Sequence, residues 1–276
     1  MCLDFDVIQS VYRNDCLEHL QISIKSIMQN TLLPVNYIIV IDGEINKAIE
    51  KYLNNLSTNN YGSKVNFKVI KLKNNIGLGQ AMNIAAEASN SSYIARMDSD
   101  DYCCKDRFRA QLNYLEKNPD TAMLGMYYDQ YDACLKTKIG ERRVPRKCAD
   151  IAKLVTSRNP INHPTIIMCR KAFLNVGGYP KDCYFFEDWM LVYKFLKAGY
   201  KICNIEMVGL KVRGGNDFYK RRKGYTYFQN ELKFFKMLKN NHYIGYYVFS
   251  KNVLQRFLLR VVLYPFVNLI YKKVMR

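Results

Sequence analysis

The first hundred residues alternate between short apolar runs and longer amphipathic segments. The apolar runs at 5–11, 37–43, 64–72 and 91–98 have the pattern of buried strands. Between them, apolar residues recur at helical spacing, as at Leu17, Leu20 and Ile24, and further helices are predicted over 46–60 and from Gly77 onward. This order predicts an alternating α/β unit.

The second half of the chain has a less regular pattern. It predicts a helix over 107–119 that Pro119 ends, strands over 122–132 and 165–170, and a helix over 187–199 closed by Gly199. The predicted fold class is therefore α/β.

Polar residues follow the ends of several predicted strands. Tyr12, Asp42, Gly77 and the acidic stretch "DSDD" (98–101) all come just beyond a strand. Because such sheets bind ligands at the carboxyl ends of their strands, we expect these residues to gather along one edge.

The stretch "DSDD" places three carboxylates in four residues, where they repel each other. One interpretation is a solvated acidic turn that caps the next helix. The other is a site for Mn²⁺ or Mg²⁺, since both ions favour carboxylates together with substrate phosphate oxygens. Asp98 and Asp100 are one residue apart, so an extended backbone points both side chains the same way.

Three other motifs carry candidate chemistry, each beside an ordinary structural explanation. Asp42 can accept hydrogen bonds from a nucleotide, but Asp-Gly is also a common turn. Glu187 and Asp188 can act as a general base or simply favour a helix start. His163 lies between two prolines, where a structural role and a substrate contact both fit. The glycines at 77 and 79 lack the third glycine of a dinucleotide fingerprint.

Composition limits the class of protein. The 276 residues are 49% hydrophobic and carry a net charge of +18, with nine scattered cysteines and no C-x-x-C pair, which favours a reducing compartment. The start of the chain shows no signal-peptide pattern. Residues 211–276 hold 15 Lys and Arg against two acids, so a nearly balanced domain carries a basic tail. The acidic motifs on that domain argue against a nucleic-acid partner, because carboxylates repel phosphates.

The tail itself mixes apolar residues with Lys and Arg. Within 252–276 the pattern predicts two short amphipathic helices interrupted at Pro265. Such helices are typical of an anionic membrane surface, and the alternative is a basic helix that packs on its own domain.

The stretches "YIIVIDG", "NNIGLGQAMNIAAEAS", "SSYIARMDSDD", "NHPT", "GGYP" and "FEDWML" occur in the order seen in family 2 glycosyltransferases of GT-A fold. The chain most resembles the bacterial members of O-antigen, capsule and amylovoran-type exopolysaccharide assembly, over about residues 5–215. The resemblance implies a GT-A fold with a mixed central sheet flanked by helices and a C-terminal amphipathic helical tail. It also implies a catalytic domain over 1–215, with a nucleotide-sugar half to about 105 and an acceptor half over 106–215. Residues 216–276 form the tail.

The resemblance also implies roles for individual residues. Asp188 matches the catalytic base, with Glu187 as its helper, and Asp100 with Asp98 matches the metal-binding pair. The acceptor side is assigned His163 and Trp189. The nucleotide-sugar side is assigned Tyr12, Asp42, Asn75, Gly77, Asn83, Arg96, Asp98 and Arg213.

The implied reaction is a single displacement that inverts the anomeric carbon. The donor is a UDP-sugar, by expectation galactose or glucose transferred in β-1,3 linkage, and the acceptor is a lipid-linked GlcNAc or oligosaccharide on undecaprenyl diphosphate. Mn²⁺ or Mg²⁺ is the expected cofactor. The expected location is the cytoplasm, at the inner face of the bacterial cytoplasmic membrane. The rival is a metal-dependent nucleotidyl- or phosphotransferase, which releases pyrophosphate or sugar phosphate instead of UDP.

Overall fold

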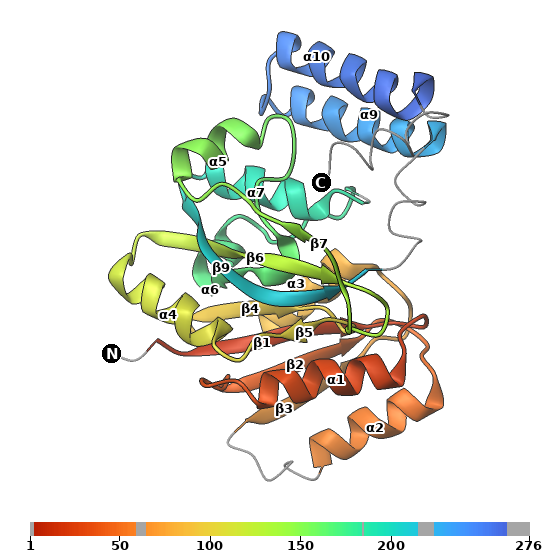
Figure 1. Ribbon diagram of the computed structural model, residues 1–276, viewed down its shortest axis with the longest axis vertical. Helices are drawn as coiled ribbons and strands as arrows, with labels where there is room; N and C mark the ends of the chain where they lie inside the picture. The colour runs from red at the N-terminus through yellow and green to blue at the C-terminus, as the bar shows by residue number, and fades with distance from the viewer. Residues whose placement is uncertain (1–2, 59–64, 184, 215–223, 264–276) are drawn as a thin grey trace.

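The computed structural model describes residues 3–58, 65–183, 185–214 and 224–263 (Figure 1). Its strands are β1 (Phe5–Val11), β2 (Asn36–Ile41), β3 (Asn66–Lys71), β4 (Tyr93–Met97), β5 (Tyr102–Cys103), β6 (Thr121–Tyr131), β7 (Lys138–Arg142), β8 (Ile167–Cys169) and β9 (Lys201–Arg213). Its helices are α1 (Leu17–Met28), α2 (Lys47–Thr58), α3 (Leu78–Ala88), α4 (Arg107–Lys117), α5 (Cys148–Leu154), η2 (His163–Thr165), α6 (Arg170–Asn175), α7 (Glu187–Lys197), α9 (Tyr225–Asn240), α10 (Tyr246–Phe257) and η3 (Leu258–Val262).

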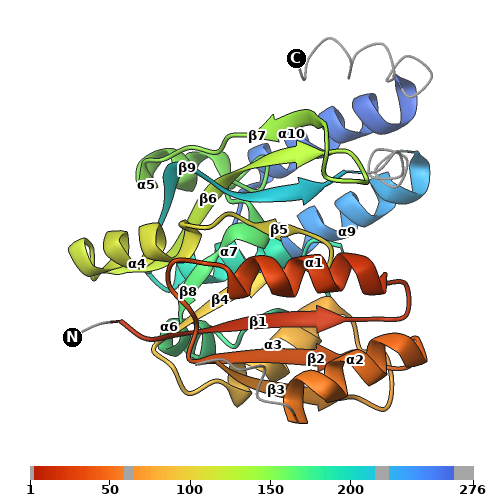
Figure 2. The same cartoon turned by 60° about the horizontal axis from the view of Figure 1, so that its bottom comes forward.

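The described strands form one mixed sheet in the order β3-β2-β1-β4-β8-β6-β9-β5, with β7 paired to β6. β1 is parallel to both β2 and β4, and β2 is parallel to β3. β8 runs antiparallel to β4 and β6. Figure 2 shows β1 and β2 pointing to the same edge, and the predicted α/β fold with a mixed sheet is confirmed.

Both faces of the sheet are covered by helices. This explains why the apolar run that begins at Tyr37 continues to the end of β2 without a charged residue. Ile38 and Val40 of β2 pack with α3 on one face, whereas Tyr37, Ile39 and Ile41 pack with α1 and α2 on the other. Successive strand residues point to opposite faces, so a strand buried on both sides is apolar at every position.

Three strands of the second half, β7, β8 and β9, differ from the sequence prediction. The strand expected over 165–170 is shortened to β8, because Thr165 belongs to the turn η2 and its Oγ1 accepts a hydrogen bond from the backbone N of Met126 (2.8 Å). The pattern did not predict β9 at all. Its pairing with β6 shifts register at several points, and such bulges remove the two-residue alternation by which a strand is recognised.

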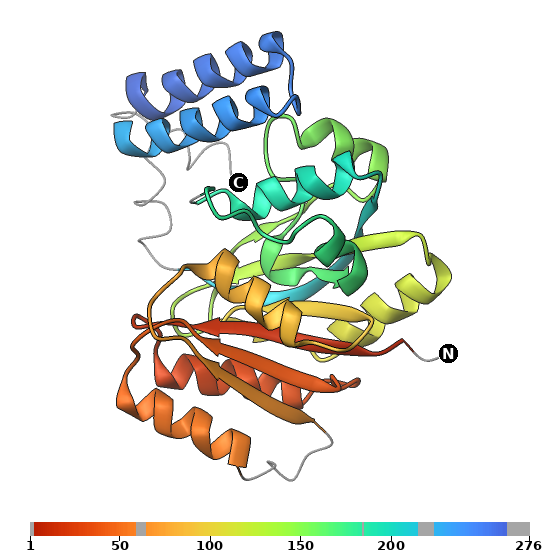
Figure 3. The same cartoon turned by 180° about the vertical axis from the view of Figure 1, so that it is seen from behind.

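The basic tail packs partly on the domain. Phe234, Phe235 and Leu238 of α9 belong to the core cluster that contains Trp189, and α10 lies beside α9 (Figures 1 and 3). α10 already begins at Tyr246 and continues through η3 to Val262, while Pro265 and the second helix expected after it lie outside the described residues. In the described part of the chain, no helix is both long and apolar enough to cross a membrane.

Candidate active site

The ends of β1, β2 and β4 bring several predicted site residues to one edge of the sheet. Tyr12 follows β1, Asp42 follows β2 and Asp98 follows β4. Two buried side chains fix the last of these, because Gln9 of β1 and Ser23 of α1 each donate to the backbone oxygen of Asp98 (2.9 Å). The ring of Tyr12 is 40% exposed at this edge and offers a flat apolar surface.

Asp42 is buried and organises the loop before α3. Its Oδ1 accepts from the backbone N of Ile76 (2.7 Å), and its Oδ2 accepts from the backbone N of Gly77 and from Nδ2 of Asn75 (3.0 Å each). At Gly43 (φ +85°), a Cβ would lie 2.7 Å from the backbone N of Asn75, so the close approach of the two loops requires glycine. The nucleotide contacts expected of Asp42, Asn75 and Gly77 stay predictions.

A fourth acid, Asp15, joins the acidic stretch after β4. Ser99 Oγ donates to Asp15 Oδ1 (2.9 Å). Burial raises the pKa of Asp15 and of Asp100 to about 6, and the charge of Asp98 acts in the same direction on both. Asp101 is 2% exposed, and burial, Asp98 and Asp100 raise its pKa well above the ordinary value. The carboxylates of Asp98, Asp100 and Asp101 therefore repel one another in the folded chain, as the sequence predicted.

Arg213, at the end of β9, braces this acidic loop. Its backbone N donates to Asp101 Oδ1 (2.9 Å), and its Nε donates to the backbone oxygen of Asp100 (2.9 Å). Its Nη1 donates to the backbone oxygen of Ala133, whereas its Nη2 is buried and has no hydrogen-bond partner among the described residues. Arg213 thus lies beside the acids, and its position near a diphosphate stays a prediction.

Arg96 connects the acids to the interior of the site. It is 3% exposed and pairs with Asp98 through both terminal nitrogens, which fixes the orientation of that carboxylate. Burial opposes the charge of the guanidinium, but Asp98 and Asp101 more than offset this effect and raise the pKa of Arg96. Its contact with a nucleotide-sugar stays a prediction.

Tyr179 anchors two further residues that the sequence singled out. Its hydroxyl lies 2.7 Å from Nε2 of His163. Its backbone N donates to Asn83 Oδ1 (2.8 Å), and its backbone oxygen accepts from Asn83 Nδ2 (2.9 Å). Asn83 therefore fixes the loop after α6, and a role at the nucleotide stays a prediction. Burial and the Arg96 guanidinium lower the pKa of His163 well below its ordinary value, so this ring is neutral.

Asp188 is held in place at the start of α7. Asn159 Nδ2 donates to Asp188 Oδ2 (2.8 Å), and Asp188 Oδ1 accepts from the backbone N of Trp189 (2.7 Å). Asn159 is itself fixed, because Arg142 Nη2 donates to its backbone oxygen (2.8 Å). Asn159 is thus a positioning residue that the sequence analysis missed.

Glu187 occupies a more buried setting than an ordinary helix start. Burial, followed by the charge of Asp188, raises the pKa of Glu187 to about 7, and its buried Oε2 has no partner among the described residues. Its side chain packs against α3, where a Cβ on Gly79 would lie 3.5 Å from Glu187 Cγ. A carboxyl group that is half ionised at neutral pH is typical of a site where protons move.

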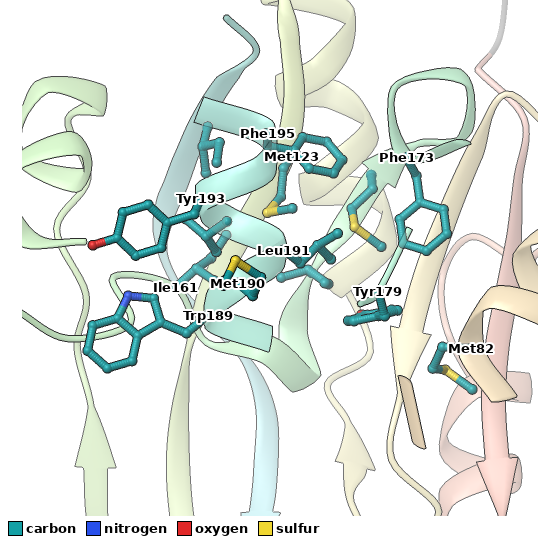
Figure 4. Packing of buried hydrophobic residues seen from close by; sticks show 14 of the residues in the cluster. Met82, Met123, Ile161, Phe173, Tyr179, Trp189, Met190, Leu191, Tyr193 and Phe195 are labelled. Carbon is teal, nitrogen blue, oxygen red and sulfur yellow. The ribbon is translucent and has the colours of Figure 1, made fainter. Parts of the chain in front are cut away.

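Trp189 is a core residue, and this corrects the acceptor contact expected of it. Its indole is 5% exposed and donates from Nε1 to the backbone oxygen of Val155 (2.8 Å). Phe234 and Phe235 of α9 pack on its ring, and Figure 4 shows it among the buried side chains around α7. In this position the indole has no surface to offer an acceptor sugar.

The acids at the strand ends suit a divalent cation that the substrate helps to hold. Within the described residues, no group of three or more His, Cys, Asp or Glu side chains is arranged to hold a metal ion by itself. Mg²⁺, however, is commonly held by one or two carboxylates and substrate phosphates. The donors here are carboxylate oxygens, and Asp101 Oδ2 has no partner among the described residues. Burial, together with neighbouring carboxylates, raises the pKa values of Asp15 and Asp100, and a cation would relieve that repulsion. The residues therefore fit Mn²⁺ or Mg²⁺.

The model of the family described as "Glycosyl transferase family 2" matches residues 6–177. The chain belongs to this family and is a glycosyltransferase. The matched region ends before α7, so Glu187 and Asp188 lie beyond it.

Two relatives extend the likeness over more of the chain. The amylovoran biosynthesis glycosyltransferase AmsE of Erwinia amylovora is 27% identical over 84% of this chain and 85% of its own length. The UDP-Gal:alpha-D-GlcNAc-diphosphoundecaprenol beta-1,3-galactosyltransferase of Escherichia coli is 30% identical over 99% of this chain and 96% of its own length.

Solved structures support the fold alone. The structure of S. aureus TarS 1-349 in complex with UDP-GlcNAc has a TM-score of 0.64 and 16% identity, and the match covers 93% of this chain and 73% of that one. A longer TarS structure has a TM-score of 0.59 and 17% identity, with 79% of this chain and 38% of that one covered.

Proposed function

We propose that the protein transfers galactose or glucose from a UDP-sugar, in β-1,3 linkage, to a GlcNAc or oligosaccharide carried on undecaprenyl diphosphate. The product serves O-antigen, capsule or exopolysaccharide synthesis. The likeness to the E. coli galactosyltransferase carries this proposal, because it runs through both halves of the domain and into the tail. The acidic groups at the strand ends and at the start of α7 supply the chemistry that such a transfer requires.

Asp188 acts as the general base in this proposal. It takes the proton of the acceptor hydroxyl while that oxygen attacks the anomeric carbon, and the bond from that carbon to the diphosphate oxygen of UDP breaks. A single displacement of this kind inverts the anomeric centre. The hydrogen bond from Asn159 (2.8 Å) and the helix start restrain the carboxylate of Asp188, which supports a fixed attack geometry.

Asp98 and Asp100 are the proposed metal ligands, and Mn²⁺ or Mg²⁺ bound there supplies positive charge to the leaving UDP. Arg96 holds the carboxylate of Asp98, and Arg213 holds the backbone at Asp100. The exposed ring of Tyr12 and the loop ordered by Asp42 are the proposed surfaces for the uridine.

The outer face of α10 is proposed to rest on an anionic membrane surface, at the inner face of the cytoplasmic membrane. Tyr246 is 76% exposed, Tyr247 79% and Leu254 60%, with Lys251 on the exposed surface between them. Exposed aromatic and aliphatic side chains combined with a basic residue are typical of helices that lie in a membrane interface.

A donor panel tests the proposal. The protein is incubated with individual UDP-sugars, Mn²⁺ and GlcNAc-diphosphate-lipid, and the product is identified by mass, glycosidase digestion and NMR of the new linkage. We expect one hexose in β-1,3 linkage and release of UDP. Release of pyrophosphate from a nucleotide donor would instead favour a nucleotidyltransferase, and an α-linked product from a UDP-α-sugar would exclude inversion.

A further inference from the structure

A basic pocket of about 480 Å³ lies outside the acidic site, between the segment after β7, helix α5 and the loop that follows α5. Arg143, Lys153 and Arg158 line it together with a single acid, Asp150, and with apolar and hydroxyl side chains. None of the residues assigned to the donor, the metal or the base belongs to this lining. The pocket therefore has the charge of an anion site without a role in the reaction described above.

Two of the three cations are available to a ligand. Arg143 is already paired, because its Nη2 lies 2.8 Å from Glu141 and 3.4 Å from Asp129. Lys153 and Arg158 are exposed, and neither forms an ion pair within the described residues. The lining thus carries an excess of positive charge that the described part of the protein does not neutralise.

The pocket is joined directly to the proposed base. Arg158 precedes Asn159, whose Nδ2 binds Asp188 (2.8 Å). The end of α5 is also fixed to α7, because the backbone oxygen of Val155 accepts from Trp189 Nε1 and from the hydroxyl of Tyr193 (2.8 Å each). α5 and α7 lie side by side in Figure 1. Arg158 is therefore next in sequence to the residue that restrains Asp188, and Lys153 lies on α5, whose end is fixed to α7.

The same loop is joined to α10 on its other side. Asn252 Nδ2 donates to the backbone oxygen of Thr156 (2.6 Å), and Arg256 Nη2 donates to that of Ser157 (2.7 Å). Leu254, on the outer face of α10, is 60% exposed. Segment 153–159 thus contacts Asp188 through Asn159 and contacts α10 through Thr156 and Ser157, and Lys153 and Arg158 flank the α10 contacts.

We propose that Lys153 and Arg158 bind the diphosphate of the lipid-linked acceptor. This inference rests on the proposed function. A GlcNAc whose hydroxyl lies at Asp188 carries its diphosphate across one sugar ring, and its lipid leaves from the far side of the diphosphate. Segment 153–159 joins the base, the cations and α10, as the acceptor joins the hydroxyl, the diphosphate and the lipid. Lysine and arginine provide charge-assisted hydrogen bonds to phosphate oxygens.

The test compares two acceptors on the full chain. One is GlcNAc-diphosphate on an undecyl chain, and the other is GlcNAc joined to the same chain without phosphate. In the double variant Lys153→Ala/Arg158→Ala, we expect KM for the diphosphate acceptor to rise by about tenfold or more, with KM for the UDP-sugar unchanged. KM for the phosphate-free acceptor should also be unchanged. The variant Lys51→Ala/Lys117→Ala removes the same charge from exposed sites elsewhere and should behave as wild type.

Equal effects on both acceptors, or no effect on either, would overturn the proposal. Binding of undecyl diphosphate without GlcNAc separates this inference from the proposed function. If the wild type transfers no sugar but binds undecyl diphosphate, and the double variant does not, the function fails and the pocket assignment stands. If the double variant binds undecyl diphosphate normally and loses only binding to phosphatidylglycerol vesicles, the pocket serves membrane headgroups and the assignment is wrong.

Discussion

Asp100 is a residue whose ionised form is disfavoured in the folded protein. Its pKa is raised to about 6 from 3.8, first by burial and then by Asp98 and Asp15. An acid with a raised pKa in the folded state binds more protons there than in the unfolded chain, so stability falls as pH rises from about 4 through about 6.

Replacing this carboxylate should therefore stabilise the metal-free protein. For Asp100→Asn we expect Tm at pH 7.5 to rise by ~2 °C or more, since about 1 kcal/mol corresponds to a few degrees for a chain of this size. The gain should disappear near pH 4, where the native carboxyl is protonated. Differential scanning calorimetry at both pH values checks this, and a loss of Tm at pH 7.5 would contradict the repulsion described for these acids. Transfer activity should be lost in the same variant.

Metal binding should depend on pH for the same reason. Below about pH 6, Asp15 and Asp100 hold protons that a divalent cation has to displace. We expect Mn²⁺ in the presence of UDP to bind about tenfold more weakly at pH 5 than at pH 7.5, by isothermal titration calorimetry. Equal affinities at the two pH values would mean that these acids do not hold the ion.

Asn159 offers a way to test the proposed base without removing it. In Asn159→Asp, a second carboxylate faces Asp188 and raises the proton affinity of the pair. We expect the acid limb of the pH profile of kcat/KM to move to higher pH, with UDP binding unchanged. Asn159→Ala removes the hydrogen bond without adding charge and should lower kcat by roughly tenfold to a hundredfold without that shift. Identical pH profiles in wild type and Asn159→Asp would exclude Asp188 as the base.

At the scale of elements, we expect α9 to contribute to folding stability and α10 to membrane binding. Phe235 of α9 is fully buried against Trp189, so Phe235→Ala should reduce the free energy of unfolding by about 3–5 kcal/mol. The variant Tyr247→Ser/Leu254→Ser changes exposed residues of α10 and should leave unfolding unchanged while weakening binding to phosphatidylglycerol vesicles.

Urea unfolding and vesicle sedimentation measure the two effects. Vesicle binding by the α10 variant at the wild-type level would show that this face does not meet the membrane. An unfolding free energy that does not change in Phe235→Ala would contradict the packing of α9 on the domain.

The sequence predicted those elements whose pattern follows local periodicity. The first four strands and the helices between them are found close to their expected positions, because each strand is buried on one or both faces along its length. β9 escaped prediction since its bulged pairing with β6 breaks the alternation of buried and exposed residues. The short strand β7 likewise has little buried surface to mark it.

The candidate site was predictable where a residue follows a strand end. Asp42 and the acids after β4 were found by that rule, and Asp15 carries the same signal after β1 but was overlooked. Asn159 gives no such signal, because its partner Asp188 is distant in sequence and the pairing depends on how α5 packs against α7. Trp189 was assigned an acceptor contact because it is an aromatic residue beside the predicted catalytic acids. In the structure α9 covers it, and the sequence pattern does not reveal how α9 packs.

At the scale of the whole molecule, positive and negative charges lie in different regions. The net charge of +18 sits mainly on the tail, while the carboxylates gather at the strand ends and at the start of α7. Family membership supports the proposal that a nucleotide-sugar binds at this acidic edge. The basic parts suit a lipid-linked, anionic acceptor at a membrane.

The central claim is that this acidic edge transfers one sugar from a UDP-sugar to a lipid-linked acceptor. The most direct measurement is the mass of GlcNAc-diphosphate-lipid after incubation with the protein, Mn²⁺ and UDP-galactose or UDP-glucose, with UDP quantified in the same reaction. We expect the addition of a single hexose matched by an equal amount of UDP, and the loss of both in Asp188→Ala. An unchanged acceptor with every UDP-sugar, in a protein shown to be folded, would contradict it.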